Sequence, residues 1–223
     1  MFLNREDAAM QLAEKLKGRP LRHPLVLAIP RGGVVTGAVL ARELGAELDV
    51  VLAVQFRARG RPDMVVGAVA EGGEVYLDAP AAAAAGTYLE EERRRGLAEI
   101  ARRAGLFRAA RPPAPVAGRS VVVADDGVIT GSTIIAALKA AKARRPHELI
   151  AAAPVAPPER LPQVRRWCDE AVCVVCPALF WAVGQLYMDF PPVEDEHAAE
   201  ILRAFAPAAP AAAPVLMILE DLF

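Results

Sequence analysis

The chain has 223 residues, 54% of them hydrophobic, which is enough for one α/β domain with an ordinary core and a small appendage. Its 26 basic and 27 acidic residues nearly cancel, which argues against a nucleic-acid-binding protein held by bulk charge. No apolar run approaches the roughly 20 residues that span a bilayer, and the first residues form no hydrophobic signal segment, so we expect a cytoplasmic protein with no membrane partner.

The first quarter of the chain alternates helical and strand patterns. Apolar residues at helical spacing predict a helix over 2–17, and the apolar run 25–30 predicts a buried strand. A helix over 34–45, ended by Gly45, and a second buried strand over 47–54 follow. Strand, loop, helix and strand in this order build parallel sheets.

The middle of the chain begins with a polar and basic segment, 55–63, which contains glycine and proline and predicts a mobile loop. Residues 65–78 predict one or two strands around a Gly-Gly turn. The Ala-rich stretch 79–86 fits either coil or the start of a helix. A charged helix is predicted over 87–108.

The last part repeats the strand, loop and helix pattern. Residues 120–144 predict a strand, a loop and a helix, and another strand follows from 148. Segment 159–190 predicts a short helix, a strand and an irregular aromatic stretch, and a last helix covers 197–205. The fold class predicted from these elements is α/β, with a mostly parallel twisted sheet flanked by helices.

The chain has three cysteines, Cys168, Cys173 and Cys176, and an odd number in an intracellular-looking chain does not indicate a disulfide framework. A zinc site is one interpretation, but the usual structural site has four ligands. Cys173 and Cys176 lie in an apolar run that resembles a strand, where residues three apart point to opposite faces. Buried, inert thiols are the favoured interpretation.

The segment VVVADDGVITGST, residues 121–133, carries the strongest functional signal. Its apolar strand leads to Asp125 and Asp126, two adjacent carboxylates suited to paired hydroxyls such as those of ribose. A small, hydroxyl-rich loop then runs into a helix, whose first N–H groups and dipole favour a phosphate. This loop comprises Gly127, Val128, Ile129, Thr130, Gly131, Ser132 and Thr133. A Walker A loop is excluded because Ser132 stands where lysine is required, and no GxGxxG follows a predicted strand.

This segment resembles the phosphoribosyl pyrophosphate (PRPP) signature of type I phosphoribosyltransferases, in which an apolar strand, two acidic residues and a Gly/Thr-rich loop follow one another. The segments AIPRGGVVTGAVLARELG, VVGAVAEGG, APVAPPE and AVGQLYMDF extend the resemblance over about residues 2–203. They are similar to a bacterial branch of the family described as predicted phosphoribosyltransferases. The resemblance implies the type I phosphoribosyltransferase fold with a small C-terminal hood.

The resemblance also implies a division of the chain and a set of ligands. It implies a core domain over 1–165 with its flexible loop at 55–63 and a hood that caps the substrate over 166–205. The Ala/Pro-rich tail over 206–223 lies outside the resemblance, and its role is open. The implied ligands are PRPP, a nucleobase-like acceptor, and Mg²⁺ held mainly through PRPP. Relatives of this family are commonly dimers, so a homodimer is expected.

The resemblance implies roles for residues outside the strongest motif. Arg31, Gly32 and Gly33, after the first strand, correspond to the loop that contacts pyrophosphate, and Arg31 joins Asp125 and Asp126 as a catalytic candidate. The loop that closes over the reacting centre carries three arginines, Arg57, Arg59 and Arg61. The branch commonly has lysine near position 55, where this chain has Gln55, so the functional cation of that loop is open.

The aromatic stretch FWAVGQLYMDF corresponds to the hood. Trp181 is the candidate that stacks on a base, although an aromatic cluster also fits a core. Asp189 is a candidate for contact with magnesium or the base. Ile129 stands where the 6-oxopurine enzymes carry an aspartate that handles the proton of the base, which argues against hypoxanthine or guanine as substrate.

The predicted function is magnesium-dependent transfer of ribose 5-phosphate from PRPP to a nitrogen nucleophile in nucleotide metabolism. Two alternatives stay open. One is a PRPP-sensing regulatory protein with little or no turnover, which Ile129 and Gln55 make credible. The other is a hydrolase acting on PRPP or a related phosphate ester.

Overall fold

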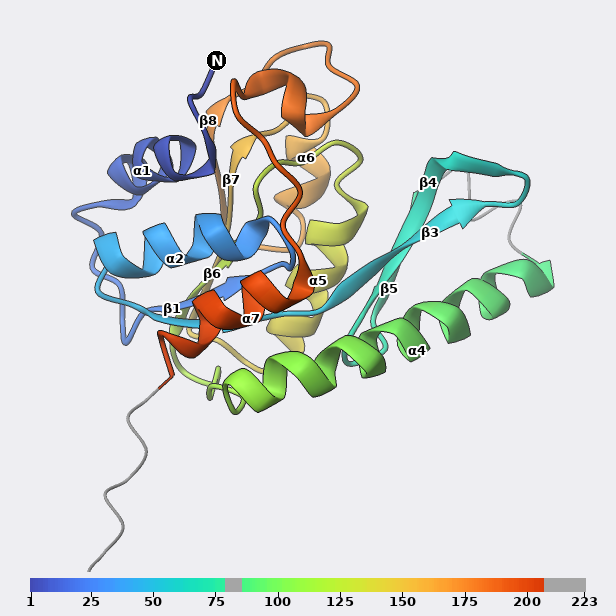
Figure 1. The fold of residues 1–223 in the computed structure, drawn as a ribbon, viewed down its shortest axis with the longest axis horizontal. Helices are drawn as coiled ribbons and strands as arrows, with labels where there is room; N and C mark the ends of the chain where they lie inside the picture. The colour runs from blue at the N-terminus through green and yellow to red at the C-terminus, as the bar shows by residue number, and fades with distance from the viewer. Residues whose placement is uncertain (79–85, 207–223) are drawn as a thin grey trace, which may run out of the picture.

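Helices and strands alternate along the computed structural model, which describes residues 1–78 and 86–206 (Figure 1). The helices are α1 (Arg5–Leu16), α2 (Gly33–Glu43), α4 (Gly86–Ala110), α5 (Ser132–Ala143), α6 (Leu161–Val164), η1 (Val183–Leu186, a 3₁₀ helix) and α7 (Asp195–Arg203). The strands are β1 (Leu25–Ala28), β2 (Glu47–Val50), β3 (Ala53–Ala58), β4 (Arg61–Ala70), β5 (Val75–Leu77), β6 (Ser120–Ala124), β7 (Glu148–Val155) and β8 (Glu170–Val175).

The core is a five-stranded sheet in the order β2-β1-β6-β7-β8, and every neighbouring pair in it is parallel. Each strand follows a helix or a long connection, as parallel pairing requires. The predicted α/β class with a mostly parallel sheet flanked by helices is confirmed.

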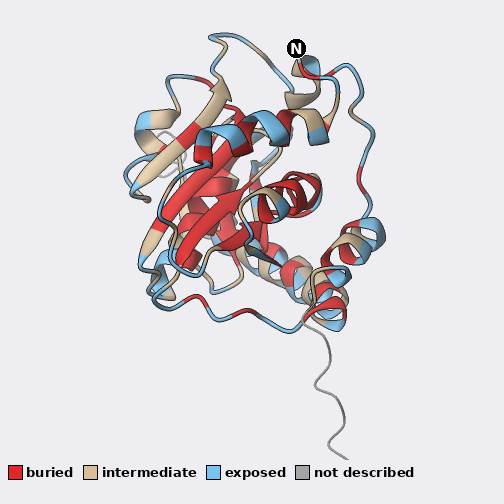
Figure 2. Ribbon diagram, turned by 90° about the vertical axis from the view of Figure 1, so that its left-hand side faces the viewer, coloured by how far each residue is buried: buried red, intermediate tan, exposed pale blue. Residues whose placement is uncertain are grey.

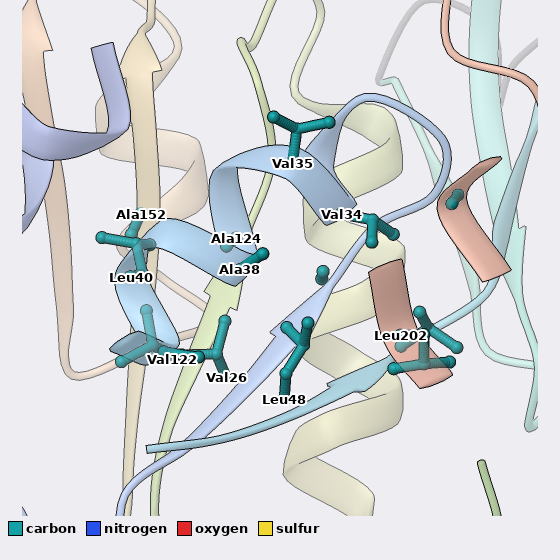
Figure 3. Packing of buried hydrophobic residues seen from close by; sticks show 14 of the residues in the cluster. Val26, Val34, Val35, Ala38, Leu40, Leu48, Val122, Ala124, Ala152 and Leu202 are labelled. Carbon is teal, nitrogen blue, oxygen red and sulfur yellow. The ribbon is translucent and has the colours of Figure 1, made fainter. Parts of the chain in front are cut away.

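Alternate residues of the central strands serve two separate cores, because successive side chains of a strand point to opposite faces. Val26 and Val122 lie in one buried cluster with Leu40 of α2. Leu25 and Val121 lie in the other, which includes the apolar face of α5. Figure 2 shows the buried residues concentrated in these strands and in the helices beside them, and Figure 3 shows Val26 and Val122 near α2. This packing holds the carboxyl ends of β1 and β6 side by side.

The predicted mobile loop at 55–63 is wrong in its local structure, because these residues belong to a β-hairpin. Strands β3 and β4 pair antiparallel, and β5 adds a third strand to this smaller sheet. Gly60, at φ +71°, allows the two-residue turn that joins β3 to β4. The predicted strand 47–54 divides between the two sheets, because Val51 and Leu52 connect them. The hairpin extends away from the parallel sheet beside α4 (Figure 1).

The predicted capping region, 166–205, contains three different parts. Strand β8 completes the parallel sheet, so the core extends beyond the expected boundary at residue 165. Segment 176–193 forms the hood and is joined to the N-terminus by a bridge between Phe2 and Tyr187. Helix α7 packs against α2 and α4. The predictions for 79–85 and for the tail 207–223 lie outside the described residues. Within the described part, no helix has the length and apolarity to cross a membrane.

Candidate active site

A cleft of about 1020 Å³ opens at the carboxyl ends of β1 and β6. Open parallel sheets bind their ligands at this edge, where loops from neighbouring strands converge. The loops after β1 and β6, the β3–β4 hairpin, α4 and the hood all contribute residues to the cleft wall. The cleft therefore joins segments that are far apart in the sequence.

Asp125 and Asp126 stand on one wall of the cleft, directly after β6. The Asp125 backbone N–H donates to Ala152 O at 3.1 Å, which continues the sheet pairing, and Asp125 Oδ1 accepts from the Asp126 N–H at 2.9 Å. Asp126 Oδ2 accepts from Arg5 Nε at 2.8 Å. The two carboxylates are thus held by different partners.

The two acidic residues also differ in the electrostatic environment of their carboxyl groups. Restricted solvation raises the pKa of Asp125 well above its ordinary value, and the adjacent Asp126 carboxylate raises it further. Asp126 instead has the Arg5 guanidinium as an ion-pair partner, and its side chain is 16% exposed. The pair therefore presents unequal carboxyl groups to the cleft.

The loop from Gly127 to Thr133 has the form of an anion cradle. Gly131, at φ +81°, is the N-cap of α5 and turns the chain into the helix. Thr130 Oγ1 donates to Ser132 Oγ at 3.2 Å and accepts from the Ser132 N–H at 3.3 Å. Val128 anchors the loop, because its N–H donates to Val155 O. The N–H groups of Ile129, Thr130 and Gly131 donate to no other described residue, so they are available to an anion at the helix start.

Most residues of this loop line the cleft, and Ser132 is the exception. Lining residues are Gly127, Val128, Ile129, Thr130, Gly131 and Thr133. Ser132 is fully buried and lies outside the lining. Gly127 is a close-approach position, because a Cβ there would lie 2.5 Å from Val183 of the hood. The loop is therefore fitted to the hood as well as to the sheet.

The loop after β1 forms the neighbouring wall. Arg31 and Gly32 line the cleft, and the Pro30–Arg31 peptide bond is cis. Arg31 is half exposed and pairs with Glu194 at 3.2 Å. Gly33 is buried beneath the loop, and a Cβ there would lie 3.0 Å from Ala124 O. Arg31 and Gly32 therefore face the cleft, and Gly33 allows α2 to start close to β6.

Of the three hairpin arginines, only Arg57 lines the cleft. Arg59 and Arg61 are exposed at the turn, outside the lining residues, so this geometry does not bring them to the site. The backbone of Arg57 is tied to α4, because its N–H donates to buried Glu92 and its carbonyl accepts from Tyr88 Oη at 2.6 Å. The hairpin thus presents one arginine to the cleft from a supported position.

The hood brings Trp181 to the cleft and leaves Asp189 outside it. Trp181 lines the cleft and is 82% exposed, so its indole ring is not a core side chain. Asp189 is exposed and outside the lining, because its N–H donates to Leu3 O as the hood runs beside the N-terminus. This position does not support the predicted contact of Asp189 with magnesium or a base.

The model of the phosphoribosyl transferase domain matches residues 2–191. The chain belongs to this family. It is 35% identical over 207 residues to the Mycobacterium tuberculosis protein named "Putative phosphoribosyl transferase Rv0571c". That match covers 91% of this chain and 46% of the relative, so the chain spans about half the length of the curated relatives it matches.

A solved structure of similar fold is the crystal structure of TT1426 from Thermus thermophilus. It is 42% identical, with a TM-score of 0.79, and the match covers 92% of this chain and 99% of that one. The resemblance to type I phosphoribosyltransferases inferred from the acidic pair and its loop is confirmed at the level of family and fold.

Three residues of this phosphoribosyl transferase domain were missed as site residues by the sequence analysis. Arg5 of α1 lines the cleft and pairs with Asp126. Tyr187 Oη donates to Asp126 O at 2.7 Å, and burial raises the pKa of this hydroxyl. Gln55 Nε2 donates to Thr133 Oγ1 at 3.0 Å, so the residue in place of the expected lysine reaches the anion cradle. Each contact joins distant segments, and no local pattern signals it.

The cysteines depart from the predicted arrangement. Cys176 is exposed, and its Sγ lies 3.2 Å from Cys173 Sγ, so the two side chains do not point to opposite faces. The reason is that β8 ends at Val175, and strand alternation no longer applies to Cys176. Burial raises the pKa of the Cys173 thiol to about 12, in keeping with an inert residue. The described residues contain no group of three or more His, Cys, Asp or Glu side chains able to hold a metal ion.

Proposed function

We propose that this protein is a magnesium-dependent phosphoribosyltransferase that moves the ribose 5-phosphate of PRPP onto a nitrogen nucleophile and releases pyrophosphate. The observation that carries the proposal is the wall formed by residues 125–133. It offers two carboxyl groups and, after Gly127 and Val128, three backbone N–H groups before the start of a helix that donate to no described residue. A ribose phosphate has the complementary pattern, with hydroxyls beside an anion.

In the proposed complex, the 5-phosphate accepts from the N–H groups of Ile129, Thr130 and Gly131. The 2- and 3-hydroxyls of the ribose donate to Asp125 and Asp126. These contacts fix the sugar at both ends and bring C1 into a defined position in the cleft. Positioning of this kind supplies a large part of the rate acceleration in group-transfer enzymes.

The pyrophosphate group is assigned to Arg31 and the backbone at Gly32, on the neighbouring wall. When the C1–O bond breaks, its electron pair leaves with the pyrophosphate oxygen, and positive charge develops on the ribose. The carboxyl groups of Asp125 and Asp126 stabilise that charge electrostatically. The lone pair of the acceptor nitrogen then forms the C1–N bond, and the proton of that nitrogen passes to water of the open cleft.

The residues of the cleft fit a magnesium ion held mainly by the substrate. Asp125 and Asp126 supply oxygen donors, and the described residues contain no larger cluster that would enclose the ion. Magnesium in nucleotide-binding sites commonly has one or two carboxylates and substrate oxygens as ligands. When bound, the ion would neutralise the leaving pyrophosphate.

The acceptor is assigned to the part of the cleft near Trp181, and Ile129 is a further lining residue of the same cleft. The exposed indole of Trp181 offers a face for a planar ring, and base stacking on aromatic side chains is favourable. Ile129 lines the cleft, and its apolar side chain cannot accept a proton or form a hydrogen bond. A nucleobase-like acceptor other than hypoxanthine or guanine therefore fits best, and a homodimer remains the expected assembly.

The test is pyrophosphate release from PRPP and magnesium, with and without a pool of purine and pyrimidine bases. We expect pyrophosphate release only when the pool of bases is present, together with formation of a new nucleoside monophosphate. Testing the bases one by one then identifies the acceptor. Release with free ribose 5-phosphate would indicate a hydrolase. Binding of PRPP without release from a folded protein would replace the transferase with a PRPP sensor.

A further inference from the structure

Arg5, at the start of α1, is a buried cation that contacts both the acidic pair and the hood. Its Nε donates to Asp126 Oδ2 at 2.8 Å, and its Nη1 donates to Pro191 O at 2.7 Å. The guanidinium lies 3.6 Å from the centre of the Phe190 ring. The Arg5 side chain is only 8% exposed, so these contacts replace its hydration. One arginine thus joins the N-terminal helix, the acidic pair and the hood.

The Arg5–Asp126 pair is enclosed on several sides. A Cβ on Gly32 would lie 1.9 Å from Asp126 Oδ2 and 2.9 Å from Arg5 Nε, so the loop after β1 closes directly over the pair. Tyr187 Oη holds the backbone of Asp126 from the hood side. An enclosed pair of this kind has little freedom to choose another geometry, unlike exposed ion pairs.

The pair also leaves one oxygen of Asp126 without a cationic partner among the described residues. Arg5 engages Oδ2, and the other group within hydrogen-bonding reach of the Asp126 side chain is the Asp125 carboxyl. Because a carboxylate is planar, fixing Oδ2 also fixes the direction of Oδ1. Asp126 lines the cleft, so the fixed oxygen is an acceptor available to a ligand hydroxyl.

We infer that Arg5 is a positioning residue that fixes the Asp126 carboxylate for the ribose hydroxyls of the substrate and ties the hood to that carboxylate. The inference rests on the proposed use of PRPP. Arg5 acts through Asp126, and its contacts to Pro191 and Phe190 make the setting of the carboxylate depend on the docked hood. The N-terminal helix is in this way part of the substrate site.

The chain offers a matched control in Arg111, which is 2% exposed in its side chain. Arg111 likewise pairs with one carboxylate, Glu47 at 2.6 Å, and donates to one backbone carbonyl, that of Phe205. It is not among the residues that line the cleft. Removing either guanidinium breaks the ion pair of a buried arginine, but Glu47 keeps Arg119 as a partner at 2.9 Å and is 48% exposed. Arg111→Met should therefore be destabilised no more than Arg5→Met.

The experiment compares Arg5→Met, Arg5→Lys and Arg111→Met at a temperature where circular dichroism shows all three folded. Direct PRPP binding with magnesium is measured by calorimetry, and kcat and KM are measured with the acceptor found above. Arg5→Met should lower kcat/KM for PRPP by about 100-fold, the scale that the loss of one partner from a buried pair allows. Arg5→Lys, which keeps the charge, should recover part of this loss, and Arg111→Met should stay within about twofold of wild type, the scatter expected for a change far from the site.

The two hypotheses fail separately. If wild type uses PRPP and Arg5→Met has wild-type kcat/KM, the positioning role is wrong and the proposed function stands. If Arg111→Met loses as much as Arg5→Met, the effect of Arg5 is general destabilisation and the inference falls. If folded wild type neither binds nor consumes PRPP, the proposed function and the role of Arg5 fall together.

Discussion

Tyr187 Oη donates a 2.7 Å hydrogen bond to the backbone carbonyl of Asp126, which connects the hood to the acidic pair. Because burial raises the pKa of Tyr187, the hydroxyl keeps its proton at physiological pH. Tyr187→Phe should therefore lower the free energy of unfolding by about 1–2 kcal/mol, since a carbonyl loses its donor. It should also weaken PRPP binding. Urea unfolding and calorimetry measure the two effects.

A suitable control for that variant is Tyr76→Phe. The Tyr76 hydroxyl makes a long 3.4 Å contact with Gln163, and Tyr76 is not among the cleft-lining residues. Equal losses of PRPP affinity in both variants would show that the hood contact has no special role.

Folding raises the pKa of Asp125, so the sign of its contribution to the pH dependence of stability can be worked out. The folded state binds a proton at this carboxyl more strongly than the unfolded state does. Stability from this group therefore declines as pH rises from the ordinary aspartate pKa through the raised folded value. Asp125→Asn should unfold at a higher temperature than wild type above neutral pH, and the gain should vanish below about pH 4. The measurement is thermal unfolding across this range.

A loss of stability is expected instead when Asp49 is replaced, because this fully buried side chain pairs with Arg108 at 2.7 Å. Asp49→Asn weakens that pair and should lower stability at neutral pH.

Asp125→Asn should also lose PRPP turnover, since it removes a proposed contact to ribose. Asp125 would then lower stability while it serves function. An Asp125→Asn protein less stable than wild type at pH 8 would contradict the assigned effect of burial.

Gly32 allows the loop after β1 to approach Asp126 and Arg5. In Gly32→Ala the new methyl carbon would meet Asp126 Oδ2 at 1.9 Å, so the carboxylate or the loop must move. A displacement of about 1 Å in an active site can cost roughly 100-fold in rate, and we expect a loss of this size in kcat/KM for PRPP. Steady-state kinetics measure it.

The paired control is Gly105→Ala, in the interior of α4. A Cβ at Gly105 would meet no atom within 4 Å. This change should raise the free energy of unfolding by about 0.5–1 kcal/mol, because alanine favours a helix more than glycine does. Normal activity of Gly32→Ala would show that the close approach around Asp126 is not required.

Trp181 should contribute to acceptor binding and little to stability. Its side chain is 82% exposed, so Trp181→Ala should change the free energy of unfolding by less than about 0.5 kcal/mol. The KM for the acceptor should rise by about tenfold, within the range for a lost base stack, and the Kd for PRPP should hold. Leu179→Ala is the control, since Leu179 is 83% exposed and outside the cleft lining. Equal acceptor KM values in the two variants would remove Trp181 from the site.

The parts of the site that sequence alone predicted are those encoded by consecutive residues. Residues 121–133 combine an apolar strand, two carboxylates and a helix start, and each local pattern determines the next element. The strand lies in the sheet because its residues are apolar, and its carboxyl end then puts Asp125 and Asp126 in the cleft.

The parts that sequence missed depend on pairing between distant segments. Arg5 looks like an ordinary polar residue at a helix start, and its partner lies 121 positions away. Segment 55–63 has loop-like composition, but pairing with the rest of β4 makes it a hairpin. Asp189 has the expected residue type, and its exclusion from the cleft follows from a backbone bond to Leu3. Local propensity contains no information on these tertiary contacts.

The ion pair of Arg31 with Glu194 has a consequence for how anions exchange at the cleft. The two side chains are 48% and 67% exposed, and pairs as hydrated as this contribute about 0–1 kcal/mol. If Arg31 holds the pyrophosphate as proposed, an arriving polyanion would displace a weakly held carboxylate rather than strip a bare cation of water. When the anion departs, Glu194 is close enough to take its place. The guanidinium would then alternate between an internal and an external counterion, and added salt should weaken both contacts together.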